Sequence, residues 1–340
     1  MLHNESIGIG STPVGSYLED DAAKTIQHAV CIFQQPWWLD AVAPGQWSEA
    51  IINRGGRIIA RFPYVARKKY GLTIISQPQL TPHLGPWFYQ SDHQKNVYKI
   101  AEQRKLMAEL LDQIPPFDYF FQGFHYSVTD FVLFHWQGFQ LIPRYYYVIK
   151  EPNLDMVWEG LDRNVRTTIR RAEKYGITII ESDDIDTLLK INRITFEKQG
   201  LKVPYSNDYV RRIDEACKRH QARKILLAYD RNGRCHSGLY LAFDEDSVHS
   251  LIGCSDPELS ASGAYTLTFW EGIKFATATS RSFDFKGSWL KQVEPFIRRF
   301  GGHQQHYCKI MKINSSILKI AYHAREYART LIGPRLSGID

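Results

Sequence analysis

Two short acidic-aromatic segments, about half a chain apart, constrain the fold more than any other feature of this sequence. Phe117-Asp118-Tyr119 and Phe283-Asp284-Phe285 start 166 residues apart (283 − 117 = 166). Each follows a predicted helix, at residues 95–113 and 262–278, and each reaches a glycine within a few residues. Strands are predicted before these helices, at residues 57–65, 72–76, 224–229, 237–243 and 247–254. This order predicts a duplicated α/β arrangement.

Length and composition agree with two domains. The chain has 340 residues, 44% of them hydrophobic, which is enough for two buried cores. It has no run of eighteen apolar residues, so no membrane-spanning helix is predicted. Residues 1–26 lack the basic and apolar regions of a secretory signal. We expect a partly mobile N-terminal extension and a cytoplasmic location.

The cysteines do not predict a disulfide framework or a metal site. Five cysteines are spread along the chain without a CxxC pair. Cys308 lies in the segment HQQHYC with His303 and His306, but zinc sites usually have a second ligand pair at a definite spacing. A strand that happens to carry two histidines is the favoured interpretation, and no metal is predicted.

Positive charge gathers on one predicted helix. The formal net charge is +6, and Arg163, Arg166, Arg170 and Lys174 recur at spacings of three or four, which places them on one helix face. One interpretation is a basic face in contact with solvent. The other is a contact for the phosphates of a nucleotide, a lipid diphosphate or an RNA.

Four segments resemble the FemAB-like branch of the GNAT acyltransferases. They are QQPWWLDAV, RNVRTTIRRAEKYG, SASGAYTLTFWEGIKFA and FDFKGSWLKQVEPFIRRFGG, and the resemblance spans residues 34–309. It implies an α/β (α+β) fold of two tandem GNAT-like domains, each a mixed central sheet flanked by helices. The implied domains are residues 27–150 and residues 151–310, the second carrying the donor site. An amphipathic helix and tail at residues 311–340 follow.

The resemblance also implies a donor site. In GNAT folds two central parallel strands separate to admit the pantetheine arm of acyl-coenzyme A, and the next helix start binds the pyrophosphate. Here residues 247–254 and 283–285 correspond to those strands. The cofactor-binding residues implied are Ser262, Gly263, Ala264, Tyr265 and Thr266. Gly263 would allow close approach of the backbone to the phosphate, and the alternative is a serine-rich cap on a buried helix.

Catalytic and substrate contacts are expected around the second strand. Asp284 is a candidate base or acceptor-positioning group, Lys286 a candidate contact to the oxyanion or a phosphate, and His249 faces the same cleft. A structural ion pair and a structural histidine are the alternatives. The expected substrate contacts are Trp38, Arg166, Arg170, Gln199, Tyr205 and Ser288. For Trp38 and its neighbour Trp37, a core anchor is the alternative.

The segment after Ser288 is predicted to be a helix that packs on the sheet. Its apolar residues recur at helical spacing, and they are Leu290, Val293, Phe296, Ile297 and Phe300. Gly301 would stop this helix, and Pro295 would either kink it or mark its start.

The predicted activity is acyl transfer from acyl-coenzyme A to an amine or hydroxyl of a nucleotide- or lipid-linked sugar in cell-envelope or surface-polysaccharide synthesis. An aminoacyl-tRNA-dependent peptidoglycan-precursor ligase of the Fem type is one alternative, disfavoured because no segment sustains heptads long enough for an RNA-binding arm. A non-catalytic binding module is the other. The expected partners are a small-molecule donor and a sugar or peptide-precursor acceptor, with tRNA and a peripheral membrane contact secondary and DNA excluded. The chain has no GxSxG, HExxH or GxxxxGK[ST] motif to suggest other chemistry.

Overall fold

The computed structural model describes residues 28–89, 95–151 and 153–332, and side chains up to residue 327. The predicted N-terminal extension lies outside the described residues. The strands are β1 (Trp47–Arg54), β2 (Arg57–Lys69), β3 (Leu72–Ser76), β4 (Trp87–Phe88), β5 (Tyr119–Gly123), β6 (Gln140–Ile149), β7 (Thr178–Ser182), β8 (Arg223–Tyr229), β9 (Cys235–Phe243), β10 (Ser247–Ser255), β11 (Ser282–Asp284) and β12 (His303–Ile313).

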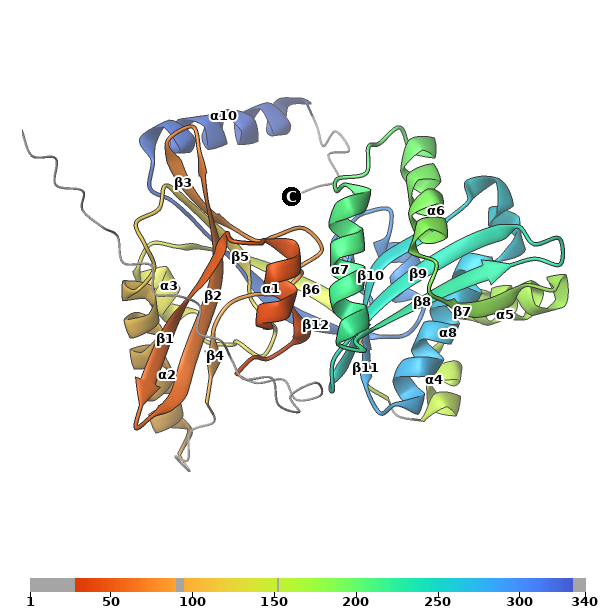
Figure 1. Cartoon of the computed structure of the whole chain (residues 1–340), viewed down its shortest axis with the longest axis horizontal. Helices are drawn as coiled ribbons and strands as arrows, with labels where there is room; N and C mark the ends of the chain where they lie inside the picture. The colour runs from red at the N-terminus through yellow and green to blue at the C-terminus, as the bar shows by residue number, and fades with distance from the viewer. Residues whose placement is uncertain (1–27, 90–94, 152, 333–340) are drawn as a thin grey trace, which may run out of the picture.

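Helices lie between these strands (Figure 1). They are η1 (Ile32–Gln34), α1 (Pro36–Val42), α2 (Asn96–Asp112), α3 (Val132–Trp136), α4 (Leu154–Gly160), α5 (Arg163–Tyr175), α6 (Ile185–Lys198), α7 (Asn207–Arg219), η2 (Pro257–Ser262), α8 (Ala264–Ala278), α9 (Glu294–Arg298) and α10 (Ser316–Ile332). None of the described helices is both long enough and apolar enough to cross a membrane.

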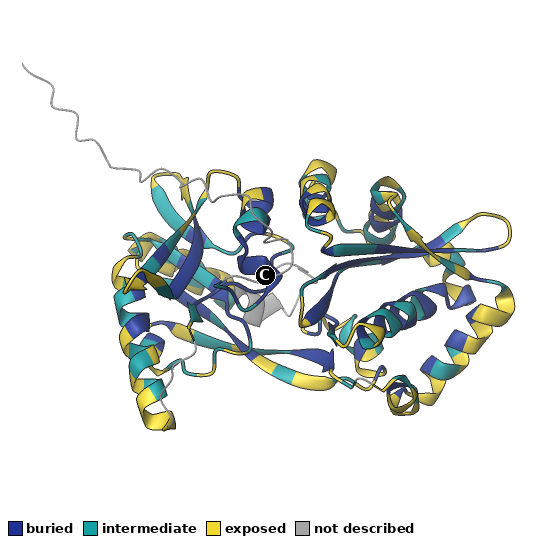
Figure 2. Ribbon diagram, turned by 60° about the horizontal axis from the view of Figure 1, so that its bottom comes forward, coloured by how far each residue is buried: buried dark blue, intermediate teal, exposed yellow. Residues whose placement is uncertain are grey.

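The described strands form one mixed sheet that runs through both halves of the chain. Its order is β1-β2-β3-β5-β12-β6-β11-β10-β9-β8-β7, and β4 pairs with β2 off this path. Helices cover both faces of the second half, with α6 on one face and α8 on the other (Figure 2). The predicted fold class, a mixed sheet flanked by helices, is confirmed.

The predicted internal repeat appears as two parallel strand pairs, each joined by a helix. In the first half β3 pairs in parallel with β5 through α2, and in the second half β10 pairs in parallel with β11 through α8. Asp118 lies just before β5 and Asp284 is the last residue of β11, so both acidic residues lie at the second strand of their pair but at different places along it. The carboxylate of Asp118 accepts a hydrogen bond from Thr73 N at 2.8 Å. Asp118 is therefore a structural residue.

The two halves exchange a strand. β6, from the first half, pairs with β11 of the second, while β12, from the second half, pairs with β5 of the first. β6 and β12 pair antiparallel with each other between these neighbours. The sheet is therefore continuous across the junction, and residues from both halves meet there. The domain boundary proposed near residue 150 stays a prediction.

The segment after Ser288 differs from its prediction. The helix α9 is short and begins at Glu294 with Pro295 in its first turn, because proline fits the helix start and not its interior. Ile297 and Phe300 are buried as predicted, whereas Phe296 is half-buried and Leu290 is exposed. The prediction was wrong for Leu290, which lies in a turn before the helix. Gly301, with φ +77°, follows the helix as its stop.

Candidate active site

The two parallel strands β10 and β11 stay paired only at their start. Their last matched residues are His249 and Asp284, where β11 ends. Lys286 and Gly287 then take left-handed backbone conformations, with φ of +49° and +66°. A residue other than glycine rarely adopts this conformation, which costs roughly 1–2 kcal/mol. The turn folds the Lys286 side chain back onto the strand that it has just left.

Lys286 holds a dense set of hydrogen bonds in the interior. Its backbone N–H donates to Asp284 Oδ1 at 3.1 Å, and its ammonium donates to Asp284 Oδ2. The ammonium also lies 2.9 Å from His83 Nε2. His83 Nδ1 lies 3.2 Å from the carbonyl oxygen of Phe124, a pure acceptor, so Nδ1 carries the proton and Nε2 accepts from Lys286. Asp284 and His83 thus fix the position of one ammonium group.

His249 lies beside this group, between two carboxylates. Its Nδ1 is 3.8 Å from Asp284 Oδ2, and its Nε2 is 3.6 Å from Asp244 Oδ2. Within the described part of the chain, neither ring nitrogen has a hydrogen-bond partner. The Phe33 ring packs against His249 with centroids 4.8 Å apart. The structure therefore brings together the three predicted catalytic residues Asp284, Lys286 and His249.

Burial and charge set the protonation of this cluster. Burial opposes ionisation of Asp284, but the charges of Lys286 and His249 outweigh it and lower its pKa to about 2. Burial lowers the pKa of Lys286, and Asp284 opposes that shift. Burial and then the Lys286 charge hold the pKa of His83 well below its usual value. The cluster therefore contains the Asp284 carboxylate, Lys286 and, at neutral pH, an uncharged His83.

Aromatic rings from the first half and from β12 line the cluster. The ammonium of Lys286 lies 4.4 Å from the ring centroid of Tyr146 on β6. Tyr146 stacks on Tyr307 of β12 with centroids 4.4 Å apart. Sequence analysis missed His83, Tyr146 and Tyr307, because each lies far from Lys286 in sequence and only the strand exchange brings them near. No local motif marks them.

The predicted donor loop packs against the helix α5. Gly263 has φ +78°, as a glycine at this position allows, and α8 begins at Ala264. A Cβ at Gly263 would lie 2.8 Å from Thr168 Cγ2 and 3.0 Å from Thr168 O, because α5 packs there. Ser262, Gly263 and Ala264 are buried. Thus α5 fills the space beside Gly263 where a Cβ would lie.

The side chains around this loop have partners inside the protein. Ser262 Oγ lies 2.9 Å from His236 Nδ1 and accepts from Ala264 N at 3.3 Å, whereas the N-cap of α8 is Gly263, which has no side chain to cap the helix. Tyr265 and Thr266 are half-buried in the first turn of α8. Binding of a coenzyme A pyrophosphate at this helix start stays a prediction.

The predicted substrate residues do not form one site. Trp38 is completely buried and donates to Thr81 Oγ1 at 3.1 Å, so the core anchor is the correct interpretation and the substrate contact was wrong. Ser288 is buried and accepts from Tyr147 N at 3.1 Å. Tyr205 accepts from Asn192 Nδ2 at 3.2 Å, and Gln199 is exposed at the end of α6. Ser288 alone among these lies in the turn that carries Lys286.

The basic residues of α5 remain on the surface. Arg166 is half-buried and Arg170 is exposed, with its guanidinium 5.4 Å from the Trp158 ring centroid. Asp162 caps this helix by accepting from Asn164 N, and Gly176 ends it in a left-handed conformation. A phosphate contact by Arg166 and Arg170 stays a prediction.

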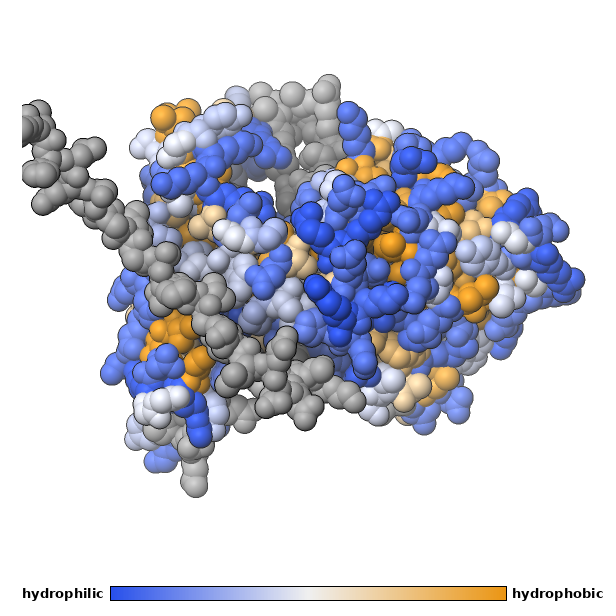
Figure 3. All heavy atoms as spheres, viewed as in Figure 1, coloured by the Kyte–Doolittle hydropathy of each residue, from blue (hydrophilic) through white to orange (hydrophobic). Residues whose placement is uncertain are grey.

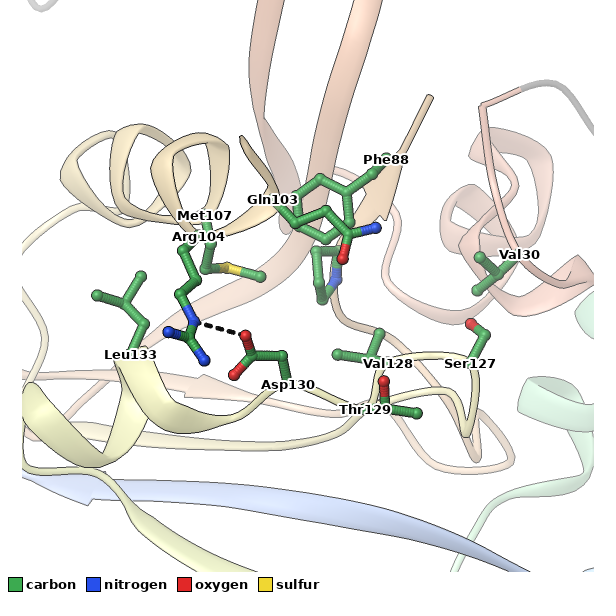
Figure 4. A pocket seen from close by; sticks show the side chains of 11 residues that line it. Val30, Phe88, Gln103, Arg104, Met107, Ser127, Val128, Thr129, Asp130 and Leu133 are labelled. Atoms are coloured by element: carbon green, nitrogen blue, oxygen red, sulfur yellow. Dashed lines mark hydrogen bonds and ion pairs between the residues drawn. The ribbon is translucent and has the colours of Figure 1, made fainter. Parts of the chain in front are cut away.

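A cavity of about 200 Å³ lies in the first half, behind the cluster. Figure 4 shows Gln103, Arg104 and Met107 of α2 on one side and residues 127–130 on the other. Arg104 Nε pairs with Asp130 Oδ2 at 2.6 Å inside it. Ser127 Oγ lies 2.9 Å from His125 Nδ1, and the His125 and His83 rings are 5.1 Å apart. His125 and His83 therefore connect Ser127, in the cavity wall, to Lys286.

Among the described residues, no group of three or more His, Cys, Asp or Glu could hold a metal ion. The segment with His303, His306 and Cys308 is the strand β12, so the strand interpretation is confirmed.

Comparison with known proteins identifies the fold. Residues 161–294 match the model of a GNAT acetyltransferase domain. A comparison with curated protein sequences gives no significant match. Among solved structures, FemX matches with a TM-score of 0.60 and 14% identity, covering 82% of this chain and 91% of its own.

Two further solved structures reach a TM-score of 0.50. One is the C-terminal domain of a protein described as a lysylphosphatidylglycerol synthetase from Agrobacterium fabrum, at 10% identity, covering 84% of this chain and 88% of that chain. The other is a conserved protein from Bacteroides thetaiotaomicron, at 12% identity, and the match covers 81% of this chain and 90% of that chain. Identities this low establish the fold alone. Residues 161–294 thus match a GNAT acetyltransferase domain, and the chain as a whole shares the fold of FemX.

Proposed function

We propose that this protein is an acyl or aminoacyl transferase in which the ammonium of Lys286 meets the reacting carbonyl. One observation carries the proposal. Lys286 is buried in a strained turn at the end of β11, where the parallel strands stop pairing, and two side chains fix its ammonium. A buried charge and a strained backbone are both costly, so they are expected mainly where function requires them.

The chemistry follows from the charge. When the amine or hydroxyl of an acceptor attacks an acyl carbonyl, a C–N or C–O bond forms and the carbonyl oxygen gains negative charge. The bond to the donor's sulfur or oxygen then breaks, and the leaving group takes up a proton. A fixed ammonium in a site without water stabilises the negative oxygen much more than it stabilises the neutral carbonyl. We assign Lys286 this role.

Asp284 and His83 are positioning residues in this proposal. Both oxygens of Asp284 accept hydrogen bonds from Lys286, and neutral His83 accepts a third. Asp284, His83 and His249 have 0% of their surface exposed, whereas Lys286 keeps 7%. Lys286 is therefore the member of the cluster best placed to touch a substrate. His249 supports Asp284 from the neighbouring strand.

The donor can be an acyl-coenzyme A or an aminoacyl-tRNA. Acyl-coenzyme A is the usual donor of the GNAT fold and remains our first donor. The aminoacyl donor is the alternative, and the name of the lysylphosphatidylglycerol synthetase denotes the joining of an amino acid to a lipid. The non-catalytic alternative leaves the cost of the buried Lys286 cluster without a reason.

The acceptor, in our proposal, occupies the cavity of Figure 4. Its wall offers the hydroxyls of Ser127 and Thr129, the amide of Gln103 and the Arg104–Asp130 pair, which suit a sugar or a peptide. A nucleotide- or lipid-linked sugar of envelope or surface-polysaccharide synthesis remains our first acceptor, and a peptidoglycan-precursor peptide the second. A cytoplasmic location belongs to this proposal.

The test is a double variant, Asp284→Asn/Lys286→Met. Breaking a buried pair by removing one partner costs roughly 3–5 kcal/mol, whereas removing both charges is often nearly neutral. The double variant should therefore stay folded and lose single-turnover transfer by a factor of about 100 or more. The matched control is Lys198→Met/Glu258→Gln, which removes an exposed pair between α6 and η2 and should change neither property.

Titration calorimetry with acetyl-coenzyme A and with deacylated tRNA should identify the donor. Binding of one of them, followed by transfer that the double variant lacks, is the expected result. Full transfer by a folded double variant would remove Lys286 and Asp284 from the mechanism. Binding of neither donor, together with no transfer, would leave a binding module.

A further inference from the structure

The C-terminal helix α10 turns an apolar face away from the protein. Ile317, Ile320, Ala324 and Tyr327 recur at spacings of three, four and three, which places them on one helix face. Ile317 is 75% exposed, Ile320 71% and Tyr327 69%. On the other side of the helix, Leu318 and Tyr322 are half-buried. An exposed apolar face of this kind on a helix indicates a contact with something outside the chain.

The tip of the β2–β3 hairpin is basic and aromatic. Arg67, Lys68, Lys69 and Tyr70 follow one another there, and all four are exposed. Tyr70 is 91% exposed, and the Lys69 ammonium lies 5.5 Å from its ring centroid. Basic residues around an exposed aromatic ring suit the boundary between an anionic surface and an apolar one.

Hydrogen bonds join the start of α10 to this hairpin. The backbone N–H groups of Asn314 and Ser315 donate to Asp118 O, at 2.8 and 3.3 Å. Asp118 in turn is bonded to Thr73 of β3, which pairs with Lys68 of β2. Figure 1 shows α10 along the upper edge of the molecule, above the hairpin, and Figure 3 shows hydrophobic atoms at the same upper edge. The apolar face and the basic tip therefore belong to one side of the protein.

We propose that this side docks on an anionic lipid bilayer. Ile317, Ile320 and Tyr327 would enter the headgroup region with α10 lying in the plane of the surface, as amphipathic helices do. Lys68 and Lys69 would meet the lipid phosphates, because each basic residue near such a surface is attracted to it. The proposal does not depend on the transfer activity. It places the protein where lipid-linked molecules are found.

The experiment is co-sedimentation with vesicles of mixed phosphatidylcholine and phosphatidylglycerol, and with vesicles of phosphatidylcholine alone. The full chain should bind the mixed vesicles, less well at high salt. Ile317→Gln/Ile320→Gln should weaken this binding roughly tenfold or more, because it removes buried apolar area. Lys68→Gln/Lys69→Gln should weaken it about as much, since each lysine contributes a factor of about five.

The matched control is Met156→Gln/Ile180→Gln, which removes two exposed apolar side chains from the second half and should leave binding unchanged. Light scattering of the protein alone completes the test. A dimer that disappears in Ile317→Gln/Ile320→Gln would mean that a second copy covers α10, and the proposal would fall. It would also fall if the chain bound RNA but no vesicles, or if the α10 and hairpin variants bound vesicles as well as the control.

Discussion

Lys286 shows how one backbone conformation can create a site. Asp284 and Lys286 were expected in a cleft, where side chains are usually partly exposed and their substitution costs little stability. The structure corrects this expectation, because Asp284 is fully buried and Lys286 nearly so. Single substitutions should therefore cost stability as well as turnover, which is why the double variant is the informative one.

The neutral histidines predict a pH dependence of stability. The pKa of His83 is well below 6.5 in the folded protein, and that of His125 is lowered to about 3, in both cases by burial and then by Lys286. In the unfolded chain both take up protons as the pH falls through 6.5. Stability is therefore complete above that pH and falls below it, by roughly 2–3 kcal/mol between pH 7 and 5.5. Asp284 affects stability only at lower pH, because its contribution is lost as the pH falls from about 4 toward its pKa of about 2.

Urea unfolding at pH 7 and at pH 5.5 measures this loss. His83→Gln/His125→Gln should reduce the difference between the two pH values, and the exposed His303→Gln should leave it as in the parent. An equal difference in all three proteins would show that the two buried histidines are not its source.

At the scale of elements, glycine positions decide where helices stop. Gly301 after α9 was predicted as a helix stop, and both it and Gly176, which ends α5, have positive φ. A contact with another helix also requires a glycine at position 301. A Cβ there would lie 2.4 Å from the carbonyl oxygen of Gly160, at the end of α4. The sequence indicated the conformation but not this contact.

Gly301→Ala should therefore destabilise the fold more than an ordinary glycine substitution. The matched variant is Gly233→Ala, with φ +75° and nothing within 4 Å of the added Cβ, which should cost about 1 kcal/mol for the backbone alone. We expect Gly301→Ala to cost at least about 2 kcal/mol more in urea unfolding, because backbone atoms must move. An equal loss of unfolding free energy in the two variants would mean that α4 moves away without cost, and would contradict this prediction.

At the scale of the whole molecule, the exchange of β6 and β12 joins the two halves. β12 brings Ile310, which is fully buried, into the core of the first half beside Phe120. Neither half has a complete sheet without the other's strand. The tandem arrangement is therefore one cooperative structure in our interpretation, with Lys286 at its junction.

Unfolding should accordingly be a single transition. Tryptophan fluorescence and far-UV circular dichroism should give coincident urea curves, and Ile310→Ala should shift both by roughly 2–5 kcal/mol. Ile180→Ala, at a half-exposed position in β7, should shift neither by much. Two separate transitions, of which Ile310→Ala moved only one, would contradict this expectation.

The sequence alone determined the features that depend on local order along the chain. The repeat of Asp118 and Asp284, the strands β3, β8, β9 and β10, the helices α2, α5 and α8, and the pairing of Asp284 with Lys286 follow from periodicity and near-neighbour spacing. The tertiary structure alone decided the rest. It put His83 against Lys286 across 203 residues, buried Trp38 in the core and covered Gly263 with α5. These contacts join segments that lie far apart in sequence, so they leave no local pattern.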